Sequence, residues 1–269
     1  MVDWLKGIRC PIVLGFDVDG ITGAINRNPK TAHLPSLMSM REYGPSIATP
    51  RILDLLESKN LKASFYIPGY IAETHIDLVQ KIHSKGHEIG HHGYMHEPPA
   101  TLSKLEEGNI LDRGTKSIET ITGEAPKGYR SPSWELSNNS LQLLHDRGFE
   151  YDSSLMGNDI PYIVNAGSGS IVEVPIHWEL DDHPFFNYSP YLGQTNVAAS
   201  PRHVFEIWSA AFEGLYNYRR SFVLTMHPWI IGRPGRLEML RQLVEHIKAF
   251  DGAEFMTILD LVHLYRNNI

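Results

Sequence analysis

The sequence predicts an α/β fold: a parallel sheet wound into a distorted (β/α)-barrel of about seven units, with helices on the outside. Short apolar runs typical of strands alternate with helical patterns along most of the chain, as parallel β–α units require. The chain has 269 residues, a normal length for one α/β barrel, and 42% of them are apolar, enough for a sizeable core. No linker-like segment interrupts it, so we expect a single domain over residues 1–269.

The expected elements follow one another in short steps. Strands are expected at residues 10–16, 61–67, 87–92, 127–130, 149–153, 171–175, 221–226 and 254–257. Helices are expected from Thr49 onward and at residues 72–85, 103–122, 137–148, 200–218, 237–250 and 258–266. Ser103 and Glu106 form a capping box, and Gly86 is a usual residue just past a helix end. Residues 18–48, rich in Gly, Pro, Asn and Ser, are predicted to form a long loop, which usually serves a site or an interface.

Composition and charge narrow the classes of partner. The formal net charge is -7, and no run of Lys or Arg exceeds the pair Arg219–Arg220, so we expect no nucleic-acid partner. No apolar run reaches transmembrane length, and residues 1–11 hold none of signal-peptide length, so we expect no membrane partner and a cytoplasmic location. Cys10 is the single cysteine, which excludes an intrachain disulfide and fits a reducing compartment.

Two carboxylates follow the first expected strand. Asp17 and Asp19 are two residues apart, so their side chains can converge on one side of an extended chain. Neighbouring carboxylates repel each other unless a cation or a proton neutralises one of them. Taken alone, an ordinary turn at Asp19–Gly20 explains the same residues equally well.

A histidine-rich segment follows the third expected strand. Histidines four residues apart occur as His83/His87, His87/His91 and His92/His96, and such a pair on one helical turn can reach one metal ion. About 0.7 such pairs are expected by chance in this composition, so one pair alone is weak evidence. Only His92/His96 lies after the strand, where the chain can coil. We favour His87 and His91 as histidines of the core.

Two further motifs lie at strand ends. Arg130 can hold a carboxylate in a fixed orientation, and Trp134 can form the wall of a groove, although a surface arginine and a core tryptophan are the ordinary alternatives. His227 ends another strand, where a histidine can serve as general acid or base near neutral pH. Asp181 or Asp182 could orient it, and the sequence leaves that choice open. Strand ends of this kind are where barrel enzymes place their sites.

The order of these motifs resembles that of the polysaccharide deacetylase family of carbohydrate esterases. The shared elements are the paired Asp, His-x-x-x-His, Arg-x-Pro-x-aromatic and Leu-x-x-His-Pro. Val18 separates the two aspartates, and in this the chain is similar to a cytoplasmic subgroup with a Helicobacter-type peptidoglycan deacetylase and cyclic imide hydrolases.

The resemblance implies a role for each motif residue. Asp17 would be the general base, tethered by Arg130, and His227 the general acid. Asp19, His92 and His96 would bind a divalent metal, with Zn²⁺ expected. Leu224 would line a small acyl pocket. Trp134, Trp178 and Tyr94 are expected to contact the substrate.

The predicted function is hydrolysis of a carbon–nitrogen amide bond that is not a peptide bond. N-deacetylation of an N-acetylated sugar or glycan is the favoured hypothesis. Ring opening of a small cyclic imide or ureide is the alternative, and a non-catalytic sugar-binding barrel is the third hypothesis. The segments 18–48 and 181–194 are expected to roof the site, and a homo-oligomer could supply part of that roof.

Overall fold

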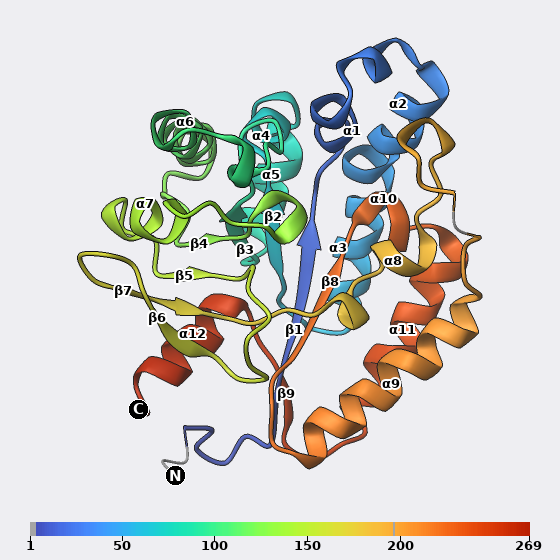
Figure 1. Ribbon diagram of the computed structural model, residues 1–269. Coiled ribbons are helices and arrows are strands. Elements are labelled where there is room, and N and C mark those ends of the chain that lie inside the picture. The colour runs from blue at the N-terminus through green and yellow to red at the C-terminus, as the bar shows by residue number, and fades with distance from the viewer. Residues whose placement is uncertain (1–3, 196) are drawn as a thin grey trace.

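The computed structural model describes residues 4–195 and 197–269, and this part of the chain folds around a nine-stranded sheet (Figure 1). The strands are β1 (Cys10–Asp17), β2 (Ser64–Ile67), β3 (Glu88–His91), β4 (Gly128–Tyr129), β5 (Tyr151–Asp152), β6 (Tyr162–Asn165), β7 (Ser170–Glu173), β8 (Phe222–Met226) and β9 (Ala253–Phe255). Their order is β6-β7-β5-β4-β3-β2-β1-β8, with β9 paired to β1. The β6–β7 pair is antiparallel and the other ladders are parallel, which confirms the predicted α/β class.

Helices surround the sheet and cap one of its ends. The α-helices are α1 (Thr22–Arg27), α2 (Pro35–Tyr43), α3 (Thr49–Ser58), α4 (Gly69–Thr74), α5 (Ile76–Ser84), α6 (Lys104–Thr122), α7 (Ser140–Asp146), α8 (His183–Phe186), α9 (Pro201–Asn217), α10 (Pro228–Ile231), α11 (Pro234–Lys248) and α12 (Ile258–Arg266). The shorter turns are η1 (Pro29–His33), η2 (Gly44–Ala48), η3 (Pro99–Thr101), η4 (Pro132–Trp134), η5 (Trp178–Leu180) and η6 (Pro190–Leu192). Across the described ranges, none of these helices combines the length and the apolarity needed to cross a bilayer.

The barrel is incomplete on one side. The parallel arc runs through β7, β5, β4, β3, β2, β1 and β8, which matches the predicted number of units. Among the described residues no ladder joins β7 to β8; the segment after β7 crosses the gap and makes a single bridge from Asp181 to Thr225. The backbone N–H of Asp182 donates to the carbonyl of Thr225 over 3.2 Å. A crossing segment therefore completes the wall where a closed barrel would have a strand.

Alternation along β1 separates an outer core from the barrel interior. Ile12, Leu14 and Phe16 pack in the outer cluster with residues of α3, α9 and α11. Val13 belongs to a second, inner cluster, which α12 completes at the amino-terminal end of the strands. Gly15 shares the inner face, and a Cβ placed there would lie 2.9 Å from Nη1 of Arg130. Glycine at this position therefore leaves room for a buried guanidinium group.

The predicted loop at residues 18–48 is wrong, because the structure has α1, η1, α2 and η2 there. Pro29, Pro35 and Pro45 each lie at the first positions of one of these short elements. Proline is compatible with a first helical turn but ends any helix that precedes it. The helices are consequently too short to show a periodic apolar face in the sequence.

Other boundaries differ by smaller amounts. The single helix expected at residues 72–85 is divided at His75, whose φ of -129° is not helical, into α4 and α5. The antiparallel strand β6 was not expected, because its four residues are only partly buried and carry a weak pattern. The capping box of Ser103 and Glu106 is confirmed at the start of α6.

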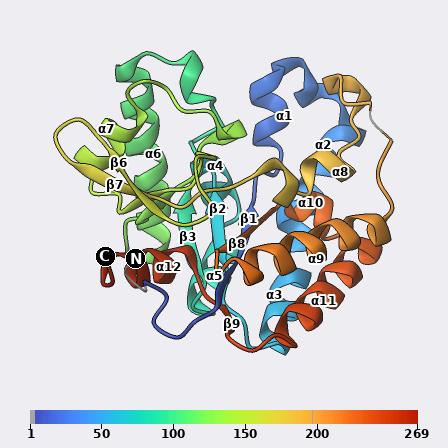
Figure 2. The same ribbon diagram turned by 60° about the horizontal axis from the view of Figure 1, so that its bottom comes forward.

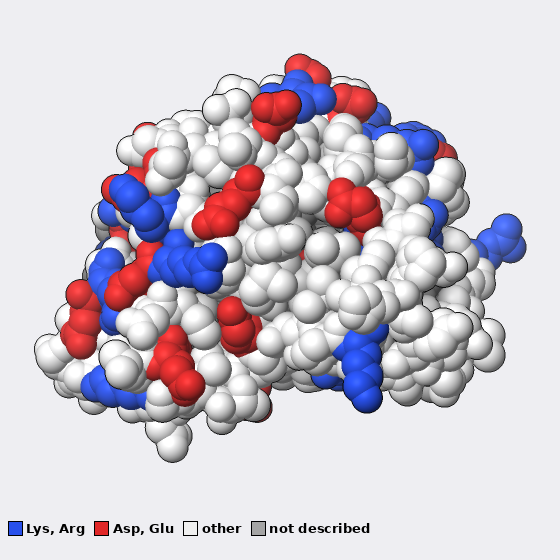
Figure 3. Space-filling view, turned by 90° about the horizontal axis from the view of Figure 1, so that it is seen from above, with Lys and Arg blue, Asp and Glu red and all other residues white. Residues whose placement is uncertain are grey.

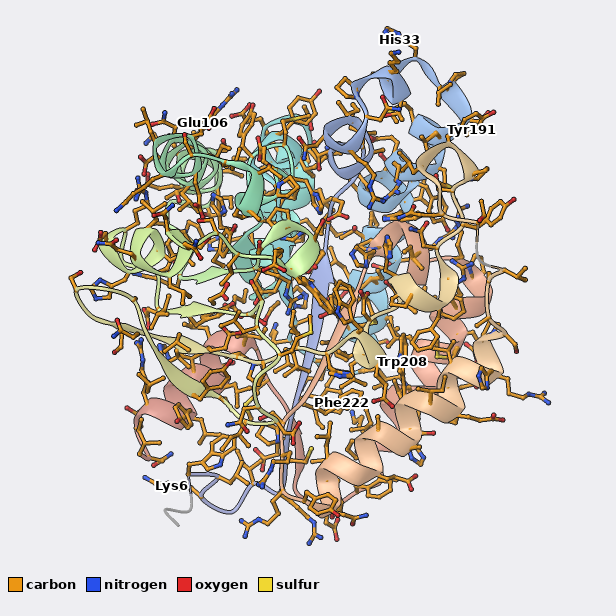
Figure 4. All side chains as sticks on the ribbon, viewed as in Figure 1. Lys6, His33, Glu106, Tyr191, Trp208 and Phe222 are labelled. Carbon is orange, nitrogen blue, oxygen red and sulfur yellow. The ribbon has the colours of Figure 1, made fainter. Side chains whose placement is uncertain are left out.

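The first described residues, before β1, and the carboxyl-terminal helix α12 lie at the end of the sheet opposite α1 and α2 (Figures 1 and 2). The carboxyl ends of the parallel strands thus point towards the cap formed by α1 and α2. The segment that contains η6 lies beside this cap, and Tyr191 marks its position (Figure 4). The two segments predicted to roof a site therefore meet over the carboxyl ends of the strands.

A buried pair of carboxyl groups, Asp152 and Glu173, stabilises the chain at the carboxyl ends of β5 and β7. Oε1 of Glu173 accepts the backbone N–H groups of Ser154 and Leu155 over 3.0 and 2.9 Å. Oδ1 of Asp152 accepts the hydroxyl of Ser154 over 2.7 Å. Burial, together with the charge of Asp152, raises the pKa of Glu173 well above its usual value. Burial likewise raises the pKa of Asp152 to about 6, so the pair retains a proton near neutral pH.

We predict that Glu173→Gln flattens the pH dependence of stability. The folded protein retains a proton that the unfolded chain releases, so wild-type stability should fall as pH rises from 5 to 7, by up to ~1.4 kcal/mol per pH unit. Glutamine can accept the same backbone N–H groups and donate to Asp152 without a proton to lose. Thermal unfolding at several pH values, with chelator present, measures the slope. The exposed Glu135→Gln is the control, and equal slopes for Glu173→Gln and wild type would contradict the assignment.

Candidate active site

A cavity of about 480 Å³ opens at the carboxyl ends of the strands. It is lined by most of the residues predicted for a site, namely Asp17, Asp19, His92, His96, Trp134, Trp178 and His227. The cap contributes Gly23, Asn26, Arg27 and Arg41, and the segment after β7 contributes His183, Leu192 and Gln194. Both segments predicted to roof the site therefore line the cavity. The first of them does so through helices α1 and α2.

Asp19, His92 and His96 converge in the cavity with a geometry that suits a metal ion. Nε2 of His92 lies 3.4 Å from Oδ1 of Asp19, and Nε2 of His96 lies 3.7 Å from Oδ2. Two ligands held ~2.1 Å from a tetrahedral ion would be about 3.4 Å apart. Oδ1 of Asp19 is buried and accepts no hydrogen bond from the described residues. A buried carboxylate oxygen without a donor is costly, and a cation would satisfy it.

Local contacts orient the two histidines. Nδ1 of His92 donates to the carbonyl of Arg130 over 2.7 Å, which leaves Nε2 directed at Asp19. The carboxylate of Glu97 accepts the backbone N–H groups of Tyr94 and Met95, over 2.9 and 2.8 Å, and closes the turn between the histidines. His96 has a φ of 61°, a strained conformation of the kind found at functional sites. The turn therefore fixes the second histidine against its backbone preference.

The protonation states also suit a cation. Burial alone would raise the pKa of Asp19, but the neighbouring His96, His92 and His227 lower it well below its usual value, so the carboxylate is ionised. Burial lowers the pKa of His96 to about 4 despite the opposing charge of Asp19, so its imidazole is neutral at pH 7. An ionised carboxylate and a neutral imidazole are the forms that bind metals.

Asp17 is held by a buried arginine. Nη1 of Arg130 donates to Oδ1 of Asp17 over 2.8 Å, and both side chains are buried. The guanidinium also donates to the backbone carbonyl and the hydroxyl of Ser153, each over 3.2 Å, and lies 4.1 Å from the ring centre of Tyr66. The other carboxylate oxygen of Asp17 lies 4.0 Å from Nε2 of His92. Asp17 thus presents one oxygen beside the candidate metal group while Arg130 holds the other.

His227 is oriented by Asp182. The sequence had left open whether Asp181 or Asp182 contacts this histidine. Nδ1 of His227 lies 2.7 Å from Oδ1 of Asp182, and its backbone N–H donates to Oδ2 over 3.0 Å. Asp181 is more distant, at 3.5 Å. Burial alone would lower the pKa of His227, but Asp182 raises it, to about 10 overall. The imidazole is therefore protonated at neutral pH, with Nε2 facing Asp19 at 3.9 Å.

An aromatic pair forms one wall of the cavity. The rings of Trp134 and Trp178 stack with centroids 4.3 Å apart. Trp134 is buried, whereas Trp178 is 46% exposed and lies at the mouth. Ser133 and Trp134 have φ values of 61° and 60°, so the backbone that presents this wall is strained.

Two residues predicted to contact the substrate, Leu224 and Tyr94, are not among those that line the cavity. Leu224 is fully buried in the outer core with Phe16 and Met226, because it points to the helix side of β8. The hydroxyl of Tyr94 donates to Glu73, and the guanidinium of Arg113 lies 3.5 Å from its ring centre, between α4 and α6. Neither position supports the predicted contact with substrate.

His87 and His91 lie outside the cavity, as expected. His91 is completely buried, and its Nε2 lies 3.2 Å from the carbonyl of Leu111. Nδ1 of His87 accepts the backbone N–H of Ala63 over 3.3 Å. Both are core histidines with partners.

Sequence reasoning missed the residues that the cap brings in. Asn26 donates from Nδ2 to the carbonyl of His96 over 2.7 Å, and Arg41 lines the same cavity from α2. Both belong to the stretch that was expected to be a loop. Their role depends on tertiary packing of short helices, for which the sequence carries no motif.

Three comparisons relate the chain to known proteins. The family model for polysaccharide deacetylase matches residues 31–151. A peptidoglycan deacetylase from Helicobacter pylori is 30% identical over 93% of this chain and 94% of its own length. A solved structure from Mycobacterium smegmatis, assigned to the polysaccharide deacetylases, has a TM-score of 0.96 at 35% identity and covers 99% of this chain and 93% of its own. The structure of Puue allantoinase shares the fold, with a TM-score of 0.84 at 21% identity over 97% of this chain and 91% of its own.

We predict that Asp19→Asn and His92→Ala lose most of a bound divalent metal, whereas Asp17→Asn retains it. A ligand must offer an ionised carboxylate or a neutral imidazole, and the two substitutions remove these donors. Elemental analysis of each purified variant, per chain, measures occupancy. His203→Ala, a change at an exposed histidine of α9, should keep the metal. Loss of metal in Asp17→Asn with retention in Asp19→Asn would reverse the two roles.

Proposed function

Because this chain belongs to the polysaccharide deacetylase family, we propose that it is a metal-dependent enzyme that removes the acetyl group from an N-acetylated sugar or glycan. The family acts on amide carbon–nitrogen bonds other than peptide bonds, so the chain is a hydrolase of that class. The observation that carries the proposal is the convergence of Asp19, His92 and His96 beside the buried pair of Asp17 and Arg130.

Asp19, His92 and His96 would hold the metal. Their two imidazoles and one carboxylate are donors that zinc accepts, and three protein ligands leave a position open, as in catalytic zinc sites. When bound, such an ion acts as a Lewis acid that activates water and polarises an amide carbonyl. The orphaned oxygen of Asp19 supports this fit.

Asp17 and His227 would divide the proton transfers. Asp17, held by Arg130 through one oxygen, would accept a proton from the attacking water with the other. His227, kept protonated by Asp182, would donate a proton to the leaving nitrogen. The base and the acid each lie next to a member of the candidate metal group: Asp17 is 4.0 Å from Nε2 of His92, and Nε2 of His227 is 3.9 Å from Asp19.

The aromatic wall supports a sugar as the substrate. Trp178 is stacked on Trp134 and exposes nearly half its surface at the cavity mouth, where the apolar face of a pyranose ring could pack. A cavity of about 480 Å³ has the size of a small-ligand pocket, so it would hold one or a few sugar units. A chitin deacetylase from Colletotrichum lindemuthianum is 29% identical over 36% of this chain, and the Helicobacter relative is a peptidoglycan deacetylase.

The sequence relatives favour deacetylation over the two alternatives, which are ring opening of a cyclic imide or ureide and a barrel that only binds sugar. The choice of Zn²⁺, the cytoplasmic location, the homo-oligomer and the single domain over residues 1–269 stay predictions.

We predict that the metal-loaded protein releases acetate from N-acetylglucosamine oligomers and that Asp17→Asn loses roughly 10²-fold or more in turnover, because the base is removed. Acetate and free amine are measured together, since deacetylation produces one of each. Asp112→Asn is the matched control, because Asp112 is 61% exposed and pairs with Arg147 away from the cavity. Hydrolysis of a cyclic imide such as succinimide, with no acetate from any sugar, would overturn the proposal.

A further inference from the structure

Arg41 lies in the cavity wall as a buried cation whose side chain has no hydrogen-bond or ion-pair partner among the described residues. Its side chain comes from α2, is 4% exposed and lines the cavity. Its guanidinium lies 3.7 Å from the ring centre of Trp229. No hydrogen bond or ion pair joins the side chain of Arg41 to any residue in the described ranges, and its Nε is buried with no acceptor.

Such an arrangement is unusual for an arginine. A buried charge is costly unless it is paired and hydrogen-bonded. Arg130, the other fully enclosed arginine of this site, meets that requirement through Asp17 and Ser153. Burial lowers the pKa of Arg41 to about 10, while Asp19 opposes that change, so Arg41 still carries its charge at neutral pH.

The acidic groups that share the cavity lie against residues other than Arg41. Asp17 pairs with Arg130, and Asp19 faces His92 and His96. Asp181 accepts the backbone N–H of His183 over 3.0 Å. None of these carboxylates is hydrogen-bonded to Arg41. The charge of Arg41 is therefore left for a ligand.

A second cation stands at the exposed rim. Arg27, at the end of α1, lines the same cavity, and its charge acts on Arg41. The surface above the site is otherwise mixed, with Lys and Arg interspersed with Asp and Glu (Figure 3). Arg41 in the wall and Arg27 at the rim thus give one cavity two cations.

We propose that this cavity selects substrates that carry an anionic group, such as a carboxylate, and that Arg41 is its receptor, with Arg27 assisting at the rim. The inference rests on the proposed function only in taking this cavity as the substrate site. Guanidinium groups bind carboxylates through two parallel N–H donors. Stacking on Trp229 fixes the plane of the Arg41 guanidinium and leaves its edge to donate. The preferred substrate class is then an N-acetylated sugar acid rather than a neutral N-acetylated sugar.

Binding to the metal-free protein tests the proposal without turnover. The probes are N-acetylmuramic acid, which carries a carboxylate, and N-acetylglucosamine, which does not, and calorimetry measures both. A charge-assisted contact should favour the acidic sugar by roughly 10- to 100-fold. Arg41→Gln should lose most of that preference. Arg51→Gln should keep it, because Arg51 contacts Tyr43 on the exposed side of the cap.

The stability of the ligand-free protein separates a receptor from a structural arginine. Removing an unpaired buried charge should leave the melting temperature of Arg41→Met equal to or above that of wild type. A structural role predicts a clear fall. Equal affinity of wild type for the two sugars, equal loss of both in Arg41→Gln, or a lower melting temperature in Arg41→Met would each overturn the proposal.

The assay of acetate release distinguishes a failure of the proposed deacetylase activity from a failure of the proposed anion selection by Arg41. Acetate released equally from both sugars by the metal-loaded enzyme would leave deacetylation intact and remove the selection for anions. Preferential binding of the acidic sugar, with no acetate released from either, would support the receptor and reject the deacetylase.

Discussion

The contact between Arg130 and Asp17 is the interaction around which the rest of the site is arranged. The guanidinium of Arg130 is enclosed at the centre of the barrel. It lies over Tyr66 of β2, beside Gly15 of β1 and against Ser153 after β5. The backbone carbonyl of the same residue accepts from His92 after β3. One residue thus sets the relative positions of side chains from several strands. Loss of either charge would leave the other buried and alone, which is strongly destabilising.

Several features of the site lower the stability of the folded protein, and packing elsewhere in the structure must compensate for them. His96, Ser133 and Trp134 have left-handed backbone conformations, and Asp19 and Arg41 have buried polar atoms without partners. These features cluster at one end of the molecule, while the inner and outer cores occupy the middle of the sheet. Strain and unpaired polar atoms are typical of sites that gain their missing partners from a ligand.

The sequence was informative where local pattern determines position. Asp17 and His227 could be placed because Asp17 ends a buried strand and His227 directly follows one, and the parallel sheet brings such ends together. The position of the Leu224 side chain could not be predicted, because the motif does not indicate whether it points into the barrel or towards the helices. Asp181 and Asp182 are adjacent, and only the path of the backbone shows that Asp182 meets His227. Arg41 carried no signal, because its environment is created by Trp229, far away in the sequence.

The incomplete side of the barrel has a consequence for how relatives of this protein can diverge. The segment that follows β7 is attached to β8 by Asp181 and Asp182, and the stretch from there to α9 forms part of the cavity wall. Because that stretch is held at its two ends, its length and side chains can change while Asp182 keeps His227 in place. Substrate range can therefore change by exchange of one surface segment, while Asp17, His92 and His227 keep their places at the strand ends.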